Sequence, residues 1–376
     1  MKNSACAPQR RQSPFGARML INGREVDYFS GTGYLGLQNH PAVVQAAMDA
    51  LQRYGFSTAT PRGSYGEHPL YDALEKEACA FFDAEKVLPF ASGYLGMAVL
   101  TQVSSSQFEH IFIDSAAHYS LWDAAQATNK PITPFHHCQP ASLEACLRRD
   151  LLTHERPLVM SDGVFPVSGE IAPLADYLAM IKPYGGLIYV DDAHGAGVLG
   201  ENGRGTLEYY HLQDECIHSC ATLSKALGGY GGLIWGDANW VENIDRNSGI
   251  CAGASPLPLP VVAASACALA LARTTPALRQ QLYENVALAR RGLRGLGWTL
   301  EDTPVPILCL EARPGFHLER IEAALFEKGI AVTVVRSYPS TPPGGALRIA
   351  IFATHTKEQI ERLVETLRSV MKSLSH

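Results

Sequence analysis

Leu187-Ile188-Tyr189-Val190-Asp191-Asp192-Ala193-His194 is a run of four apolar residues that ends in two acids and, two residues later, a histidine. The apolar run is continuous and β-branched enough to form a strand that is buried on both faces of a parallel sheet. Strands of this kind present their ligands at their carboxyl ends. The sequence therefore predicts that Asp191 and His194 lie at that edge of the sheet.

A lysine follows in a second stretch, Thr222-Leu223-Ser224-Lys225, which leads into the glycine-rich segment ALGGYGG. Asp191, His194 and Lys225 are the three kinds of polar group that pyridoxal phosphate (PLP) needs. A buried Asp191 carboxylate requires a cation, and the protonated pyridine nitrogen of PLP is one. His194 can reach the phenolic oxygen of the ring. The sequence therefore predicts a PLP site.

Lys225 is the predicted Schiff-base lysine. A free lysine has a pKa of about 10.4, so it reacts near neutral pH only if desolvation or a neighbouring charge lowers that pKa. A crowded turn beside a cationic cofactor can supply both effects. The alternatives are a solvated surface lysine, and an Asp191 or Asp192 that only caps the following turn.

Composition limits the possible functions of this chain. Its 376 residues, 47% of them hydrophobic, are typical of a soluble globular protein with one large and one smaller domain. A net charge of -6 without a basic stripe disfavours nucleic acid as a partner. There is no apolar run of about 18 residues, and the first 19 residues lack the apolar segment of a signal peptide. We therefore expect no membrane span and a cytoplasmic protein.

The nine cysteines form no CxxC pair, which suits reduced thiols in a reducing compartment. Four potential zinc ligands are close in sequence: His211, Cys216, His218 and Cys220. Their spacing matches no standard zinc finger, so we predict no metal site.

Short apolar runs alternate with helical stretches over residues 87–190, which indicates βαβ units and a parallel sheet. Before them we expect a hairpin over 18–29 with an Asn22-Gly23 turn, and helices over 42–54 and 70–82. The Pro-rich residues 255–260 lead into a long helix that ends near Arg273. Beyond it we expect strands near 306–310, 331–335 and 347–352, and helices over 317–328 and 357–374. The predicted division is an N-terminal arm and hairpin (1–40), a large PLP-binding domain (41–260) and a small α+β domain (261–376).

Other polar residues are candidates for binding phosphate and substrate. Ser92-Gly93-Tyr94 follows a strand and begins a helix, where backbone N–H groups can bind phosphate, although a plain βα loop has the same pattern. The Thr222 hydroxyl can reach the same phosphate. His118 follows another strand and either stacks on the cofactor or is structural. Arg348 lies within an apolar strand and needs a carboxylate partner, which an amino-acid substrate supplies.

The order and spacing of these motifs resemble the α-oxoamine synthase family of fold-type-I PLP enzymes. The resemblance runs from Tyr34-Leu35-Gly36-Leu37 to LRIAIFATHT at residues 347–356. It implies an α/β fold in which a large domain holds a mostly parallel seven-stranded sheet and a smaller α+β domain follows. It also implies a homodimer with shared active sites that condenses an amino acid with an acyl thioester, such as acyl-CoA, to an α-aminoketone.

The resemblance also implies a role for each matching residue. His118 stacks on the PLP ring, Asp191 holds the pyridine nitrogen, and His194 contacts the phenolic oxygen. Lys225 forms the imine with PLP, and Thr222, Gly93 and Tyr94 bind its phosphate. Arg348 binds the substrate carboxylate. Because such dimers share their sites, Ser255 is a candidate for a phosphate contact that comes from the partner subunit.

Two departures from the family pattern lie near the expected substrate. Thr32, in Gly31-Thr32-Gly33-Tyr34-Leu35-Gly36, replaces an asparagine that commonly helps to hold the substrate carboxylate. Pro166, in Gly163-Val164-Phe165-Pro166-Val167-Ser168-Gly169, replaces a serine and removes its hydroxyl. We therefore expect PLP chemistry to be retained, but the sequence does not identify the amino acid or the acyl donor.

Three alternative functions remain at this point. The first is another PLP reaction, by an aminotransferase, decarboxylase or aldolase, and the second is a non-catalytic PLP-binding sensor or assembly partner. The third is nicotinamide binding by GAGVLG at residues 195–200, which lacks the full spacing of the dinucleotide fingerprint.

Overall fold

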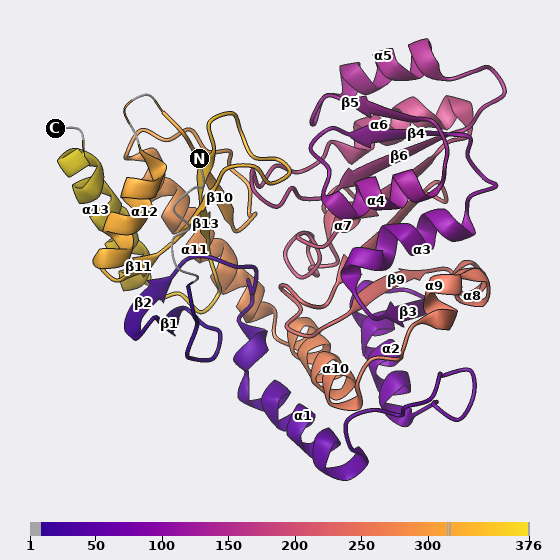
Figure 1. The fold of residues 1–376 in the computed structure, drawn as a ribbon, viewed down its shortest axis with the longest axis horizontal. Helices are drawn as coiled ribbons and strands as arrows, with labels where there is room; N and C mark the ends of the chain where they lie inside the picture. Colours follow the sequence, from indigo (N-terminus) through magenta and orange to yellow (C-terminus); the bar gives the residue numbers. More distant parts are fainter. Residues whose placement is uncertain (1–8, 314, 316, 375–376) are drawn as a thin grey trace, which may run out of the picture.

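A seven-stranded sheet forms the centre of the larger lobe in the computed structural model, which describes residues 9–313, 315 and 317–374 (Figure 1). The strand order is β3-β9-β8-β7-β6-β4-β5, and β9 alone runs antiparallel to its neighbours. The strands are β3 (Lys86–Phe90), β4 (His110–Asp114), β5 (Ile132–Phe135), β6 (Pro157–Asp162), β7 (Leu187–Asp191), β8 (Ile217–Thr222) and β9 (Gly232–Gly236). The expected mostly parallel sheet is confirmed.

Helices cover both faces of this sheet, so its central strands are buried on both sides. Tyr189 of β7 packs into a cluster with residues of α3, α4 and α8, whereas Ile188 and Val190 pack into another with α5 and α6. The helices of this lobe are α2 (Pro69–Phe82), α3 (Gly96–Val103), α4 (Tyr119–Ala127), α5 (Pro140–Asp150), α6 (Leu174–Ile181), α7 (Thr206–Tyr209), α8 (Ala238–Asn247) and α9 (Gly249–Gly253). Burial on both faces explains the continuous apolar run that ends at Asp191.

Two three-stranded sheets lie in the smaller lobe (Figure 1). One is antiparallel, in the order β10 (Ile307–Glu311), β13 (Ala346–Ala350) and β12 (Thr333–Val335). The other joins the predicted hairpin, β1 (Arg18–Ile21) and β2 (Arg24–Tyr28), to β11 (Ile330–Ala331). The N-terminal hairpin therefore packs on the C-terminal part of the chain.

The strand expected near 331–335 is wrong as a single element. Ile330 and Ala331 pair in parallel with β2, whereas Thr333–Val335 pairs antiparallel with β13. The chain changes sheets at Val332, because its apolar residues complete two different sheets.

Four long helices follow the larger lobe or cover the smaller one: α10 (Leu259–Thr274), α11 (Pro276–Arg294), α12 (Leu318–Glu327) and α13 (Lys357–Leu374). Helix α10 packs against α2 and against α1 (Pro41–Tyr54), which lies at the lower edge of Figure 1. The proposed domain boundary at residue 260 therefore falls within the first turn of a helix that contacts the preceding lobe. In the described chain no single helix is long and apolar enough to cross a membrane. Helices α10 and α11 reach that length and apolar character only together, as a pair bent by 73°.

Candidate active site

A cavity of about 750 Å³ opens at the carboxyl ends of the parallel strands and extends to the smaller lobe. Asp191 ends β7 and Thr222 ends β8, while His118 follows the end of β4. This is the edge at which open α/β sheets bind ligands. The cavity brings together all the predicted site residues except Ser255: Thr32, Gly93, Tyr94, His118, Asp191, His194, Thr222, Lys225 and Arg348.

Lys225 lies in the turn after β8, and its side chain reaches into the cavity. Its Nζ is 2.9 Å from Nε2 of His194. Burial lowers the pKa of the Lys225 ammonium below its usual value; Asp191 and Asp162 oppose this effect, and Arg348 adds to it. The lysine is therefore in surroundings that favour a nucleophilic amine.

His194 is buried between Lys225 and Tyr34. Its Nδ1 lies 2.7 Å from the Tyr34 hydroxyl. Burial lowers the pKa of His194 well below its ordinary value, and the neighbouring Lys225, in its ammonium form, and Arg348 lower it further. The imidazole is therefore neutral at physiological pH.

Asp191 is held at the cavity wall by the Ala193 N–H, which donates to its Oδ1 over 3.1 Å. The Ser120 hydroxyl lies 3.4 Å from its Oδ2, but donates its one hydrogen to Nδ1 of His118, 2.8 Å away. Only 7% of the residue is exposed. A carboxylate so enclosed is suited to a cationic partner such as a pyridinium nitrogen.

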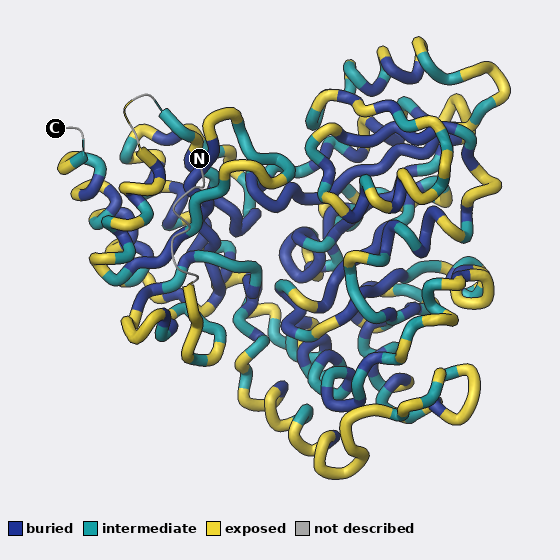
Figure 2. The backbone as a smooth tube through the Cα atoms, viewed as in Figure 1, coloured by how far each residue is buried: buried dark blue, intermediate teal, exposed yellow. Residues whose placement is uncertain are grey.

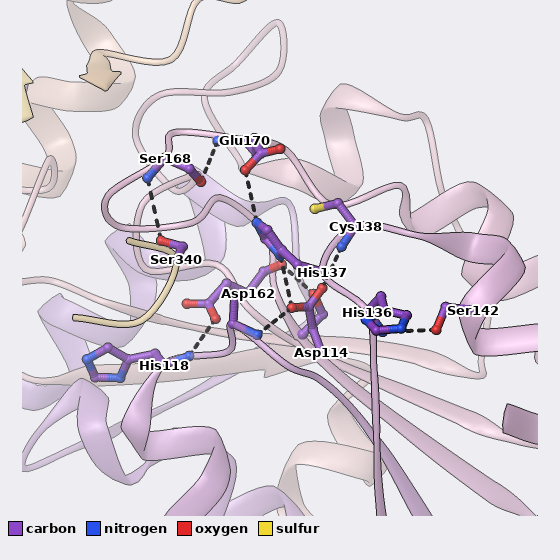
Figure 3. Close-up of polar contacts among 12 residues, drawn as sticks. Asp114, His118, His136, His137, Cys138, Ser142, Asp162, Ser168, Glu170 and Ser340 are labelled. Atoms are coloured by element: carbon purple, nitrogen blue, oxygen red, sulfur yellow. Dashed lines mark hydrogen bonds and ion pairs between the residues drawn. The ribbon is translucent and has the colours of Figure 1, made fainter. Parts of the chain in front are cut away.

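His118 caps the start of α4 and also lines the cavity. Its main-chain N–H donates to Asp162 Oδ2 over 2.9 Å, as Figure 3 shows. Its Nδ1 accepts from the Ser120 N–H over 3.2 Å, so Nε2 carries the hydrogen and donates to the Tyr338 hydroxyl, 2.7 Å away. Both ring nitrogens are thus fixed by neighbours, and the orientation of the ring is defined.

The predicted phosphate-binding turn lies where β3 meets the short 3₁₀ helix Gly93–Leu95, which runs into α3. Ser92 Oγ accepts from the Tyr94 N–H over 3.3 Å and caps this start. A Cβ on Gly93 would come within 2.5 Å of the Thr222 Cβ, so only glycine allows this close approach. The turn and the Thr222 hydroxyl therefore form one cradle, and with Lys225 and Asp191 the residues present fit PLP.

Arg348 extends from β13 of the smaller lobe into the cavity, and its guanidinium is buried. Its Nε donates to the Pro166 carbonyl oxygen over 2.7 Å, and its Nη1 donates to the Gly31 carbonyl oxygen over 3.1 Å. Thr32, next to Gly31, lines the same cavity. The two departures from the family pattern, Thr32 and Pro166, thus both lie beside this arginine.

Ser255 lies elsewhere in this chain. It is exposed and lines a second cavity, of about 610 Å³, with Arg62 and Lys86. This cavity extends to Ala91, the residue before Ser92 at the edge of the first cavity. The predicted phosphate contact of Ser255 with the partner subunit's cofactor stays a prediction.

Sequence reasoning missed Ser120, Asp162 and Tyr338, which line the cavity, and Tyr34, which contacts the lining residues His194 and Arg348. Asp162 ends the apolar strand β6 as Asp191 ends β7, so the same sequence signal was present. Burial and the nearby Asp191 raise the pKa of the Asp162 carboxyl well above its usual value. Tyr338 comes from a loop of the smaller lobe and has no comparable local signal.

A second polar cluster lies behind the cavity, where His137 bridges Asp114 and Glu170 (Figure 3). Both ring nitrogens are 2.9 Å from a carboxylate oxygen. Burial opposes a charge on His137, but hydrogen bonds to Asp114, Cys138 and Glu170 outweigh it and raise the pKa of His137 to about 12. Asp114, His137 and Cys138 are close enough to hold a metal ion, but the charged imidazole already satisfies both carboxylates.

Comparisons with known proteins agree with this geometry. Residues 29–367 match the family model described as aminotransferase class I and II. An 8-amino-7-oxononanoate synthase of Alkaliphilus oremlandii is 31% identical over 97% of this chain and 92% of the relative, and one of Geobacter sulfurreducens is 34% identical over 96% and 92%. A solved serine palmitoyltransferase of S. paucimobilis with a bound PLP–myriocin aldimine has a TM-score of 0.90 and 26% identity, and covers 98% of this chain and 93% of its own.

Proposed function

This chain belongs to the aminotransferase class I and II family, and within it to the α-oxoamine synthases with PLP as cofactor, and we propose that it condenses an amino acid with an acyl-CoA to an α-aminoketone. One juxtaposition carries the proposal. Lys225 and Arg348, a candidate base and a candidate carboxylate anchor, face the same cavity beside the candidate cofactor acid Asp191.

Each side chain of the cavity has a defined task in this reaction. Arg348 binds the carboxylate of the amino acid and so orients the bonds of its α-carbon. Bound PLP supplies an electron sink for negative charge at that α-carbon. Asp191 keeps the pyridine nitrogen protonated, His194 contacts the phenolic oxygen, and the turn of Gly93 and Tyr94 with Thr222 binds the phosphate.

One residue moves the α-proton, and a second stabilises the oxyanion. Lys225, as an amine of lowered pKa, removes the α-proton of the amino acid. His118 has a hydrogen on Nε2 and stabilises the oxyanion that develops when the α-carbon attacks the thioester. The carbon–sulfur bond then breaks, and CoA leaves as the thiol with the proton that Lys225 had removed. Loss of the carboxylate as carbon dioxide, with a proton from water added to the α-carbon, gives the α-aminoketone.

A product assay tests this function. The PLP-loaded protein is mixed with a panel of amino acids and acyl-CoAs, and thiol release is measured together with the mass of the product. We expect thiol release that requires both substrates and is lost in Lys225→Ala but kept in Lys182→Ala, a surface lysine paired with Asp214. Keto acid or carbon dioxide without thiol would instead favour an aminotransferase or a decarboxylase.

A homodimer is the proposed assembly. Large apolar side chains are exposed along one side of α1 and in the loop that follows, namely Val44, Met48, Leu51, Phe56 and Tyr65. Figure 2 shows this helix and loop as mostly exposed. The spacing of the three α1 residues places them on one helical face, as expected for a helix that packs against another surface.

Light scattering tests the assembly. We expect the parent protein to have twice the chain mass, 40.7 kDa, and Met48→Glu with Leu51→Glu to be monomeric. Leu152→Glu, at an exposed leucine outside this face, should stay dimeric. A monomeric parent protein would contradict the proposed dimer and the role of Ser255 in the partner's site.

The cytosol is the proposed location of the enzyme. The eight cysteines of the described chain are all free thiols, and six of them are only partly buried. Thiols of this kind persist in a reducing compartment. Fractionation of the source cells, with the protein followed by antibody, tests this: recovery in the periplasmic or extracellular fraction would contradict it.

A further inference from the structure

A hydrogen-bond path runs from Arg348 through Tyr34 and His194 to Lys225. Arg348 Nη2 lies 3.4 Å from the Tyr34 hydroxyl, and that hydroxyl lies 2.7 Å from His194 Nδ1. On the other side of the imidazole, Nε2 is 2.9 Å from Lys225 Nζ. Tyr34 is fully buried and His194 is 5% exposed, so the hydrogen bond between them is shielded from bulk water.

The chemistry of these groups gives the path a direction. A guanidinium only donates, so the Tyr34 oxygen accepts from Arg348. Burial raises the pKa of Tyr34 to about 12, although Arg348 opposes this effect, so the hydroxyl keeps its own proton. In the described chain the Tyr34 hydroxyl has two hydrogen-bond partners, Arg348 and His194, and of these only His194 Nδ1 can accept its proton. Because a buried hydroxyl proton without an acceptor is costly, Nδ1 is the unprotonated nitrogen.

The tautomer of His194 determines what Lys225 can do. A neutral imidazole without a hydrogen on Nδ1 carries it on Nε2. That hydrogen faces Lys225 Nζ, which accepts it only through the lone pair of an uncharged amine. Other groups also act on this pair: Asp191, Asp162, Arg348 and Cys220 on the lysine, and Arg348 and His118 on the imidazole. The directions of both pKa shifts agree with a neutral imidazole beside a neutral amine.

We propose that Tyr34 is a positioning residue that fixes His194 in its Nε2–H tautomer and thereby keeps Lys225 as an unprotonated amine. The inference rests on the role proposed above for Lys225. When that amine adds to the PLP aldehyde, a carbon–nitrogen bond forms and water leaves, and only the lone pair of an unprotonated nitrogen can begin this step. Tyr34 itself touches neither reacting atom.

Nitrogen NMR reads the tautomer directly. The full-length protein without cofactor is labelled with ¹⁵N at histidine, and the His194 signals are identified by their loss in His194→Gln. We expect a protonated Nε2 and an unprotonated Nδ1 in the parent protein. A hydrogen on Nδ1 in the parent protein would overturn the proposal, whatever the enzyme turns over.

Reconstitution with PLP tests the consequence for Lys225. In Tyr34→Phe the imidazole loses the donor to Nδ1, so Nε2 can become an acceptor and favour the ammonium form of the lysine. At pH 7.5 we expect the visible absorbance of bound PLP to appear about three- to tenfold more slowly, as a pKa rise of up to about one unit requires. The difference in reconstitution rate between Tyr34→Phe and the parent protein should disappear as the pH rises.

Tyr71→Phe is the matched control. Tyr71 is equally buried, and its hydroxyl donates to the Leu257 carbonyl oxygen over 2.8 Å, outside the cavity. Its variant should keep the parent pH profile of reconstitution. Thermal unfolding shows whether both variants are folded. A folded Tyr34→Phe with the parent profile, or a deficit that does not change with pH, would refute the proposal, because a merely structural loss has no such pH dependence.

Discussion

Arg348 Nε donates a hydrogen bond of 2.7 Å to the main-chain carbonyl oxygen of Pro166, and this bond joins the smaller lobe to the larger one beside the cavity. Since the acceptor is a backbone atom, the absence of a side-chain hydroxyl at Pro166 does not affect it. The guanidinium makes two further bonds, to the Gly31 carbonyl oxygen and the Tyr34 hydroxyl. The arginine is therefore fixed in place before an amino acid binds.

Arg348→Lys should weaken binding of the amino acid selectively. A lysine ammonium cannot reproduce the planar fork, so we expect KM for the amino acid to rise about ten- to hundredfold while KM for the acyl thioester changes little. Arg336→Lys is the control, because Arg336 lines the same cavity but pairs with Glu319. An equal rise in both KM values would mean that Arg348 is not the carboxylate anchor.

The His137 cluster should make stability depend on pH. His137 has a folded pKa of about 12, against about 6.5 when unfolded, so it binds a proton in the folded state that the unfolded chain has lost. Its stabilisation is complete below pH 6.5 and is lost as pH rises toward 12. Between pH 7 and 10 the unfolding free energy of the parent protein should therefore fall more steeply than that of His137→Gln, by up to about 1.4 kcal/mol per pH unit.

Urea unfolding at several pH values measures this difference. His136→Gln is the control, because the neighbouring His136 does not bridge the two carboxylates and should retain the slope of the parent protein. Parallel curves for the parent protein and His137→Gln would show that His137 is not charged in the folded state.

The sequence predicted those parts of the site that have a local cause. Asp191 follows an apolar run, and that run had to be a buried strand whose end meets the cavity. Lys225 lies in a turn that its glycines predict, since Gly228 and Gly231 have positive φ values. The roles of these residues came from the resemblance to a family and not from their positions alone.

The missed elements depend on packing between distant segments. Tyr338 contacts His118 from 220 residues away, and no pattern within either segment indicates that pair. Strand β5 was not predicted because Pro134 interrupts it, and proline is tolerated there only because β5 lies at the edge of the sheet. Helix α11 does not share this reason: its apolar residues have helical spacing, so the sequence carried the signal that predicts it.

Gly93→Ala should impair the binding of PLP without unfolding the protein. Its Cβ would come within 2.5 Å of the Thr222 Cβ and 2.8 Å of Oγ1, so the turn or the threonine must move. We expect the Kd for PLP to rise at least about tenfold, equal to about 1.4 kcal/mol. Gly16→Ala is the control, since its nearest neighbour, the Arg18 carbonyl oxygen, is 3.7 Å away. Fluorescence titration with PLP measures both, and an unchanged Kd in Gly93→Ala would exclude this turn as the phosphate cradle.

Asp162→Asn should stabilise the protein without cofactor, and more so as pH rises. Burial and the neighbouring Asp191 raise the folded pKa of Asp162 well above the value of about 3.9 in an unfolded chain. The folded state thus retains a proton that the unfolded state loses, and this costs stability as pH rises above about 4. Asparagine removes that cost but still accepts from the His118 N–H, whereas Asp162→Ala leaves this donor without its acceptor. In urea unfolding at pH 5, 7 and 8, we expect Asp162→Asn to have a higher unfolding free energy than both the parent protein and Asp162→Ala. The difference between Asp162→Asn and the parent protein should grow as the pH rises. If this difference in unfolding free energy stays constant or shrinks as the pH rises, Asp162 is ionised in the folded protein.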